Sequence, residues 1–190
     1  FVGDIGREAD RLAKITEKLL SISRLESETR EQPYGVDVKA VVQRALQLIR
    51  PLAENGGIEL KHELEDGCIV LATEDDMHQI VFNLVENAVK YTPPGGEVRV
   101  TLSKSEKEVC LIVADTGIGI PSEDLPHIFD RFYRVDKARS REAGGSGLGL
   151  SIVQHAVLIH GGTVKAEPVQ TGGTRFTVCF PFYKEKGGAS

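Results

Sequence analysis

The stretch DDMHQIVFNLVENAVKYTP, residues 75–93, constrains the fold most, because it has the pattern of one long amphipathic helix. Apolar residues recur every three or four positions, as on a helix face that packs against a core. These residues are Met77, Ile80, Val81, Leu84, Val85 and Ala88. Polar residues share that spacing on the other side: Asn83, Glu86, Asn87 and Lys90. The stripe is most simply a solvated face, but it can also present amides, a carboxylate and an ammonium group to one ligand.

Two further helices and six strands are predicted around this stretch. Asp37 is a suitable N-cap for a helix in which Pro51 should produce a kink or begin the end. Another helix is predicted over 148–159. Alternating or short apolar runs predict strands at 58–64, 68–72, 98–102, 109–114, 163–167 and 174–180. The order predicts an α+β fold, a two-layer α/β sandwich whose mixed, mostly antiparallel sheet has helices on one face.

The N-terminal segment has a different period. Between residues 5 and 26 the steps between apolar residues alternate between three and four, which is typical of a bundle or coiled-coil helix. A lone helix cannot bury such a seam, so a partner helix or a second chain is expected. The predicted organisation is a bundle helix over 1–29, a linker over 30–35, a compact domain over 36–183 and a polar tail over 184–190.

Composition argues against several classes of function. A net charge of -5 argues against nucleic-acid binding. No apolar run in the sequence approaches the roughly 20 residues of a membrane span, so no membrane contact is expected for these 190 residues. No signal peptide is visible, and the start FVGDIGREAD, without Met, indicates an excised fragment. The basic residues that could meet an anion are Lys90, Arg131, Arg134, Lys137, Arg139 and Arg141.

The three cysteines are isolated in the sequence. Cys68, Cys110 and Cys179 lie in apolar, strand-like runs, which favours buried thiols in a reducing cytoplasm. No two of them are close in sequence, so the spacing predicts no metal site.

Four motifs, in this order, resemble the sensor histidine kinases of two-component systems. NLVENAVKYTP at 83–93 is similar to their N box, and DTGIGIP at 115–121 is similar to their first glycine box. IFDRFYR at 128–134 is similar to their F box, and GGSGLGLSIV at 144–153 to their second glycine box. The resemblance extends from about Ile5 to Pro181, and four motifs together are highly specific. It implies the ATP-binding catalytic domain of the gyrase, chaperone, kinase and mismatch-repair superfamily.

The resemblance assigns the adenine end of an ATP site. Asp115 ends a predicted strand directly before Gly117 and Gly119. A carboxylate there can accept from the adenine amino group, while the glycines allow the backbone to approach the ring. Tyr91 is expected to pack on the adenine face. An ordinary tight turn would have the same Asp-x-Gly-x-Gly sequence.

The phosphate end involves the second glycine box. Gly145, Gly147, Leu148 and Gly149 lead into a helix N-terminus, which suits a phosphate. A dinucleotide-binding loop would need a preceding strand and a following parallel strand, whereas a charged, lid-like stretch precedes this one. Arg134 is either a phosphate or partner contact or a solvated side chain.

Magnesium and catalytic roles fall on the polar stripe. The resemblance places Mg²⁺ on Asn87, with Asn83 beside it, and an amide oxygen is a suitable hard ligand. Lys90 can neutralise phosphate charge. Glu86 is expected to support the acceptor histidine, although in related ATPases a glutamate on this helix activates water. The expected catalytic residues are therefore Glu86, Asn87 and Lys90.

The resemblance implies one activity and leaves two alternatives. The expected function is transfer of the γ-phosphate of ATP to a histidine and then to a response-regulator aspartate, with ATP and Mg²⁺ as cofactors. The segment 1–29 resembles the second helix of the dimerisation and phosphotransfer region, so a homodimer is expected in a parent protein that is membrane-anchored with this part in the cytoplasm. None of the five histidines has the setting of the acceptor, so the acceptor helix is a further expected partner. A gyrase-like or mismatch-repair-like ATPase and a non-catalytic docking module are the alternatives.

Overall fold

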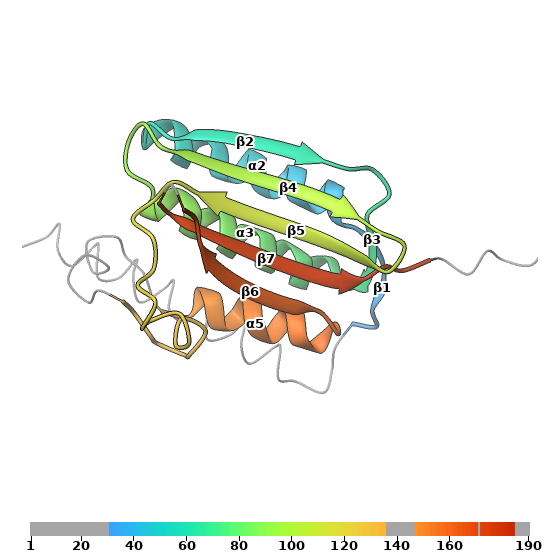
Figure 1. Ribbon diagram of the computed structural model, residues 1–190. Helices are drawn as coiled ribbons and strands as arrows, with labels where there is room; N and C mark the ends of the chain where they lie inside the picture. Colours follow the sequence, from blue (N-terminus) through green and yellow to red (C-terminus); the bar gives the residue numbers. More distant parts are fainter. Residues whose placement is uncertain (1–30, 136–146, 171, 185–190) are drawn as a thin grey trace, which may run out of the picture.

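The computed structural model describes residues 31–135, 147–170 and 172–184 (Figure 1). The predicted bundle helix over 1–29 therefore lies outside the described residues. The elements within these ranges are β1 (Tyr34–Asp37), α2 (Val38–Asn55), β2 (Glu59–Leu64), β3 (Ile69–Ala72), α3 (Glu74–Tyr91), β4 (Glu97–Lys104), β5 (Glu108–Asp115), α5 (Gly149–Ile159), β6 (Thr163–Pro168) and β7 (Thr174–Pro181).

The main sheet has five strands in the order β2-β4-β5-β7-β6. Strands β2 and β4 are parallel, and the other neighbours are antiparallel. Helices α2, α3 and α5 pack against one face, with α3 in contact with both of the others (Figure 1). The opposite face of the sheet carries no helix in the described part of the chain. The predicted α+β fold, with a mixed and mostly antiparallel sheet and helices on one face, is confirmed.

The core lies between the sheet and the three helices. In β4, β5 and β7 every second residue is buried, which is the alternation of a sheet covered on one face. The predicted apolar stripe of α3 is buried throughout: Met77, Ile80, Val81, Leu84, Val85 and Ala88. None of the helices in the described ranges is long and apolar enough to cross a membrane.

Helix α3 begins and ends through side-chain contacts. The Thr73 hydroxyl accepts a hydrogen bond from the Asp76 N–H at 3.3 Å, so Thr73 is the N-cap of this helix. Three acidic residues occupy the first turn, where they interact favourably with the helix dipole. At the other end the Thr92 hydroxyl donates to the Ala88 carbonyl at 2.6 Å, and Pro93 follows. The helix therefore places Asn87 and Lys90 in its last turns.

One strand was not expected from the sequence, and the helix that contains Pro51 extends one turn beyond it. Strand β1 was not predicted, because Pro33 and Gly35 are typical of a linker; it pairs antiparallel with β3 in the register Tyr34↔Ala72. Helix α2 continues past Pro51 to Asn55. The proline is tolerated because residues after it still make helical backbone hydrogen bonds. One of these runs from the Gly56 N–H to the Leu52 carbonyl at 3.1 Å.

The cysteines correct the prediction of three buried thiols. Cys68 is a buried free thiol, as expected, and its burial raises the pKa of the thiol. Cys110 and Cys179 instead form a disulfide between β5 and β7, 69 residues apart in sequence. Both are half-buried and point to the uncovered face of the sheet, because Val109 and Leu111 point to the core. Sequence spacing could not reveal this pair, since strand register brings it together.

Candidate functional site

Asp115 is the centre of the candidate site. It is the last residue of β5 and only 7% exposed. Its Oδ1 accepts hydrogen bonds from the Gly117 N–H at 2.8 Å and the Thr174 N–H at 3.2 Å. Burial raises the pKa of the carboxyl group, and these two hydrogen bonds partly oppose that shift. Within the described ranges no donor is bonded to Oδ2, so this oxygen can accept a bond from a ligand.

The loop after β5 lies against the C-terminal end of α3. The Ile118 N–H donates to the Tyr91 carbonyl at 3.1 Å. A Cβ atom at Gly117 would lie 2.5 Å from the Tyr91 carbonyl oxygen and 2.7 Å from Asp115 Oδ1, so only glycine fits there without a shift. Asp115 therefore lies beside the last turn of α3, one turn after Asn87.

The polar stripe of α3 divides into two environments. Asn83 is 7% exposed, and its Nδ2 donates to the Gln79 carbonyl at 2.7 Å. A Cβ atom at Gly149 would lie 3.0 Å from Asn83 Oδ1, so this amide oxygen faces the first residue of α5. Glu86, Asn87 and Lys90 are half-buried. The stripe is thus not a fully solvated face, because α5 begins against it.

The start of α5 suits an anion. Among the described residues no side chain caps this helix at Leu148, whose carbonyl accepts the first helical hydrogen bond, from the Ile152 N–H at 3.0 Å. Uncapped N–H groups and the helix dipole both favour a negative charge. Gly147 has φ +70 and its carbonyl accepts from the Phe132 N–H at 2.9 Å. This contact joins the segment 128–134 to the second glycine-rich segment.

Arg134 carries an unsatisfied buried donor. Its Nη2 is inaccessible to solvent and has no hydrogen-bond partner among the described residues. A buried guanidinium nitrogen without an acceptor is unfavourable, and an anionic group can satisfy it. Phe129 anchors the same segment on the core through an edge-on contact with Phe176, ring centroids 6.5 Å apart. Phe132, by contrast, is 60% exposed, so it does not anchor the segment on the core.

The contacts above join two groups of predicted site residues. Tyr91, Asp115 and Gly117 meet at the C-terminal end of α3, and Asn83 meets Gly149 at the start of α5. Gly119 continues the loop and lies opposite Gly173, whose oxygen would be 3.6 Å from an added Cβ. Gly145 lies outside the described residues, as do Lys137, Arg139 and Arg141.

Sequence reasoning missed the loop before β7. The Thr174 N–H helps to hold Asp115, and a Cβ atom at Gly173 would lie only 2.0 Å from the Asp115 carbonyl oxygen. The signal was the pair Gly172-Gly173 directly before a strand. Its meaning depended on the register Ala114↔Arg175, which places this pair beside Asp115.

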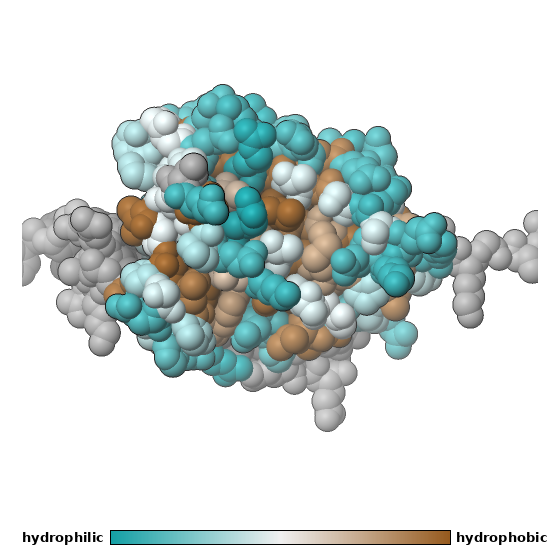
Figure 2. Space-filling view, viewed as in Figure 1, coloured by the Kyte–Doolittle hydropathy of each residue, from teal (hydrophilic) through white to brown (hydrophobic). Residues whose placement is uncertain are grey.

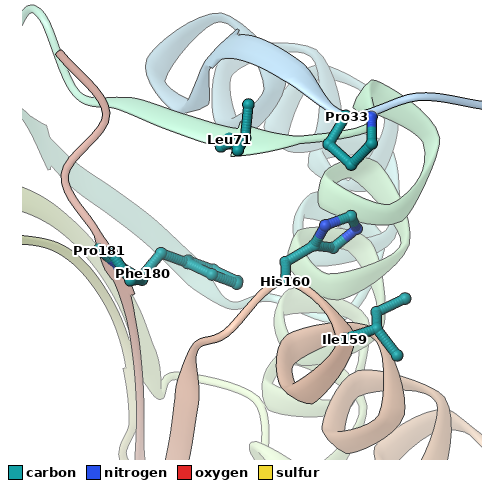
Figure 3. A pocket seen from close by; sticks show the side chains of 6 residues that line it. All are labelled: Pro33, Leu71, Ile159, His160, Phe180 and Pro181. Atoms are coloured by element: carbon teal, nitrogen blue, oxygen red, sulfur yellow. The ribbon is translucent and has the colours of Figure 1, made fainter.

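A separate pocket of about 210 Å³ lies at the opposite end of the helices (Figure 3). It is lined by Pro33, Leu71, Ile159, His160, Phe180 and Pro181, none of which is a predicted site residue. His160 Nε2 lies 2.7 Å from the Asp76 carboxylate, so this contact joins the C-terminal end of α5 to the first turn of α3. The pocket is therefore distinct from the site around Asp115, which lies at the other end of both helices.

Comparison with known proteins identifies the family. Residues 72–184 match the family described as histidine kinase-, DNA gyrase B-, and HSP90-like ATPase. The chain belongs to this ATPase family. The matched range contains α3, β5 and α5, and so every described residue of the candidate site.

Among its relatives, the ATPase domain resembles sensor histidine kinases. It is 36% identical over 186 residues to the sensor-like histidine kinase SenX3 of Mycolicibacterium smegmatis, covering 97% of this chain and 48% of that protein. The structure of full-length ShkA in complex with AMPPNP matches with a TM-score of 0.80 at 30% identity, covering 94% of this chain and 37% of that one.

A third comparison shows the fold alone. Histidine kinase ThkA, in complex with response regulator protein TrrA, matches with a TM-score of 0.76 at 23% identity, over 97% of this chain and 51% of that one. The chain spans about half or less of the length of the curated relatives that it matches.

Proposed function

We propose that this chain is the catalytic part of a sensor histidine kinase, which binds ATP with Mg²⁺ and transfers the γ-phosphate to a histidine. The observation that carries the proposal is the buried Asp115 carboxylate, which two backbone N–H groups fix beside the C-terminal end of α3. The similarity to SenX3 and to ShkA, whose structure contains an ATP analogue, supports it.

At the adenine end, Asp115 Oδ2 accepts a hydrogen bond from the exocyclic amino group. The low exposure of Asp115 makes the bond selective, because a base without a donor would leave a buried carboxylate unsatisfied. Gly117 and Gly119 let the ring approach the backbone, and Tyr91 packs against its face.

At the phosphate end, the uncapped start of α5 binds the phosphate oxygens. Backbone N–H groups of the segment with Gly145, Gly147, Leu148 and Gly149 donate to them. Arg134 Nη2 also donates to a phosphate, because none of the described groups accepts a hydrogen bond from it. Lys90 adds a positive charge from the last turn of α3.

The residues of α3 fit a magnesium ion held through an amide. Asn87 supplies the oxygen ligand, and Asn83 Oδ1 lies toward Gly149, between α3 and the phosphate segment. When bound, Mg²⁺ neutralises charge on the phosphate oxygens. Glu86 orients the attacking histidine as a supporting base. Because phosphoryl transfer depends mainly on positioning and charge, Glu86 contributes less than Asn87 and Lys90.

The remaining parts of the proposal concern partners. The acceptor histidine belongs to a dimerisation helix that pairs with the segment 1–29 in a homodimer, and a response regulator then receives the phosphate. The complex of ThkA with TrrA is an example of such an encounter in a protein of the same fold. The domain acts in the cytoplasm, where ATP and response regulators are found.

Two measurements test this function. Calorimetry with ATP and Mg²⁺ should show binding to the chain, and Asn87→Ala should abolish it with the fold intact, while Gln47→Ala on the exposed face of α2 should not. Incubation with γ-labelled ATP should label a supplied acceptor helix and leave this chain unlabelled.

The outcomes separate the alternatives. If this chain by itself acquired acid-labile phosphate, the expectation that none of its histidines is the phosphate acceptor would be wrong. Steady hydrolysis of ATP without transfer would favour the gyrase-like activity, with Glu86 activating water. Absence of nucleotide binding would favour the docking module.

A further inference from the structure

The uncovered face of the sheet carries a row of sulfur and oxygen atoms. In the register of the sheet, Cys110 of β5 lies between Ser103 of β4 and Cys179 of β7, and Cys179 lies beside Thr163 of β6. The Cα atoms of the two cysteines are 4.2 Å apart. This spacing is that of a closely spaced, non-hydrogen-bonded antiparallel pair, in which side chains approach each other most closely.

Glu108 adds a third potential ligand. It precedes Cys110 by two residues on β5, so both side chains are on the same face. A carboxylate oxygen of Glu108 and the sulfur atoms of Cys110 and Cys179 all lie within 4.8 Å of one another. Glu108 is exposed and the cysteines are half-buried, so an ion can reach the group from solvent.

We propose that Glu108, Cys110 and Cys179, once the disulfide is reduced, form a binding site for one thiophilic divalent cation, with Zn²⁺ as the fitting ion. Thiolates with a carboxylate are a ligand set that zinc accepts, with water in the fourth position. A tetrahedral ion with Zn–S bonds of about 2.3 Å requires sulfur atoms about 3.8 Å apart. Rotation about the Cα–Cβ bonds can separate two cysteines of a close antiparallel pair by that amount.

The disulfide and the metal exclude each other. In the disulfide each sulfur is bonded to the other, so neither is a thiolate ligand. A phosphine reductant breaks the S–S bond with water, giving two thiols and a phosphine oxide. A bound cation then displaces two thiol protons, so binding strengthens with pH. In a reducing compartment the pair is a dithiol, which is the form that binds.

This site is separate from the nucleotide site. Cys110 precedes Asp115 by five residues on one extended strand, which corresponds to about 17 Å. The ligand chemistry differs as well, because Mg²⁺ prefers oxygen atoms and thiolates select softer ions. Figure 2 shows this face of the molecule, on which hydrophobic and hydrophilic residues are interspersed. The bound ion would link β5 to β7 in place of the disulfide.

Cobalt(II) spectroscopy on the whole chain tests the proposal. After reduction by a phosphine and removal of the reductant, Co²⁺ should produce the thiolate-to-metal charge-transfer bands of tetrahedral ligation at one equivalent, and Zn²⁺ should displace it. The oxidised chain should give no such bands. Glu108→Gln removes one ligand of the ion and should weaken binding about tenfold or more, because even the loss of a group that only supports a metal ligand costs about that much. Glu106→Gln, in the exposed turn before β5, is the matched control and should leave the affinity unchanged.

Binding of Zn²⁺ to the two cysteines can also be tested with the wild-type protein alone. Zn²⁺ should protect Cys110 and Cys179 from alkylation, as read by peptide mass spectrometry, whereas buried Cys68 should not respond to the metal. The proposal is overturned if the reduced chain gives no thiolate bands, or if the bands persist in the double variant Cys110→Ser/Cys179→Ser. Unchanged affinity in Glu108→Gln would remove the carboxylate from the ligand set.

Discussion

Replacing Asp115 with asparagine separates the structural role of this side chain from its role toward a ligand. One oxygen accepts from the N–H groups of Gly117 and Thr174, and the asparagine carbonyl can keep both bonds. The other oxygen becomes an NH₂ group, which cannot accept a bond from an amino group. Asp115→Asn should therefore fold normally and bind ATP weakly.

The expected loss follows from the type of bond. A hydrogen bond to a charged group contributes about 1.5–3 kcal/mol, which corresponds to roughly tenfold to 150-fold in affinity. Calorimetry measures the ratio of the affinity for ATP to the affinity for inosine triphosphate, which has a carbonyl in place of the amino group. The wild type should prefer ATP, and Asp115→Asn should lose or reverse the preference because its NH₂ group can donate to that carbonyl.

Asp115→Ala is the informative contrast. It leaves the Gly117 and Thr174 N–H groups without their acceptor, at a cost of about 1–3 kcal/mol for each buried group. Thermal unfolding should therefore show a clear loss of stability in the alanine variant and little loss in the asparagine variant. If Asp115→Asn bound ATP as the wild type does, or kept the wild-type ratio of ATP to inosine triphosphate affinity, Asp115 would not contact the base.

Three further measurements test the packing and the electrostatics. Gly117→Ala should lower stability by about 1–3 kcal/mol and weaken ATP binding, because its Cβ would overlap the Tyr91 carbonyl. Gly95→Ala is the control: its Cβ meets no atom within 4 Å, so it should cost about 1–2 kcal/mol of stability through its φ of +84 and leave ATP binding unchanged. Leu84→Ala in the core should reduce the free energy of unfolding by about 2–5 kcal/mol, against at most about 0.5 kcal/mol for exposed Leu48→Ala, by denaturant titration. Burial raises the pKa of Asp115, so the folded state binds this proton more tightly than the unfolded state does; stability due to Asp115 is present below the unfolded pKa and is lost as pH rises through the folded pKa. Asp115→Asn should therefore gain stability relative to the wild type as pH rises from 3 to 7, and a constant difference would contradict the burial argument.

Periodicity predicted the helices and the central strands well, because their side chains alternate between core and solvent. The apolar stripe of α3 is an example: all six of its predicted residues are buried. Strand β1 escaped detection because a four-residue strand beside Pro33 has no room for a periodic signal. Its pairing with β3 comes from tertiary contacts instead.

The site was predictable only where its residues are close in sequence. The contact of Gly117 with Asp115 is local and follows from the motif. The bond from Thr174 to Asp115 spans 59 residues and depends on how β7 pairs with β5. The buried state of Asn83 likewise depends on α5, whose first residue lies against its amide oxygen. Composition and residue spacing do not predict such contacts between residues that are far apart in sequence.

The cysteines show how the same register changes a chemical conclusion. Isolated cysteines indicate no metal site when ligands are expected close together in sequence, as in a zinc ribbon. An antiparallel sheet supplies ligands in another way: residues i and i+2 of one strand, together with the residue opposite on the next, converge on one face. Glu108, Cys110 and Cys179 satisfy that rule across a 69-residue separation. The pairing that holds Thr174 against Asp115 therefore also assembles the thiol pair, so a shift of β7 by one residue would disrupt both sites together.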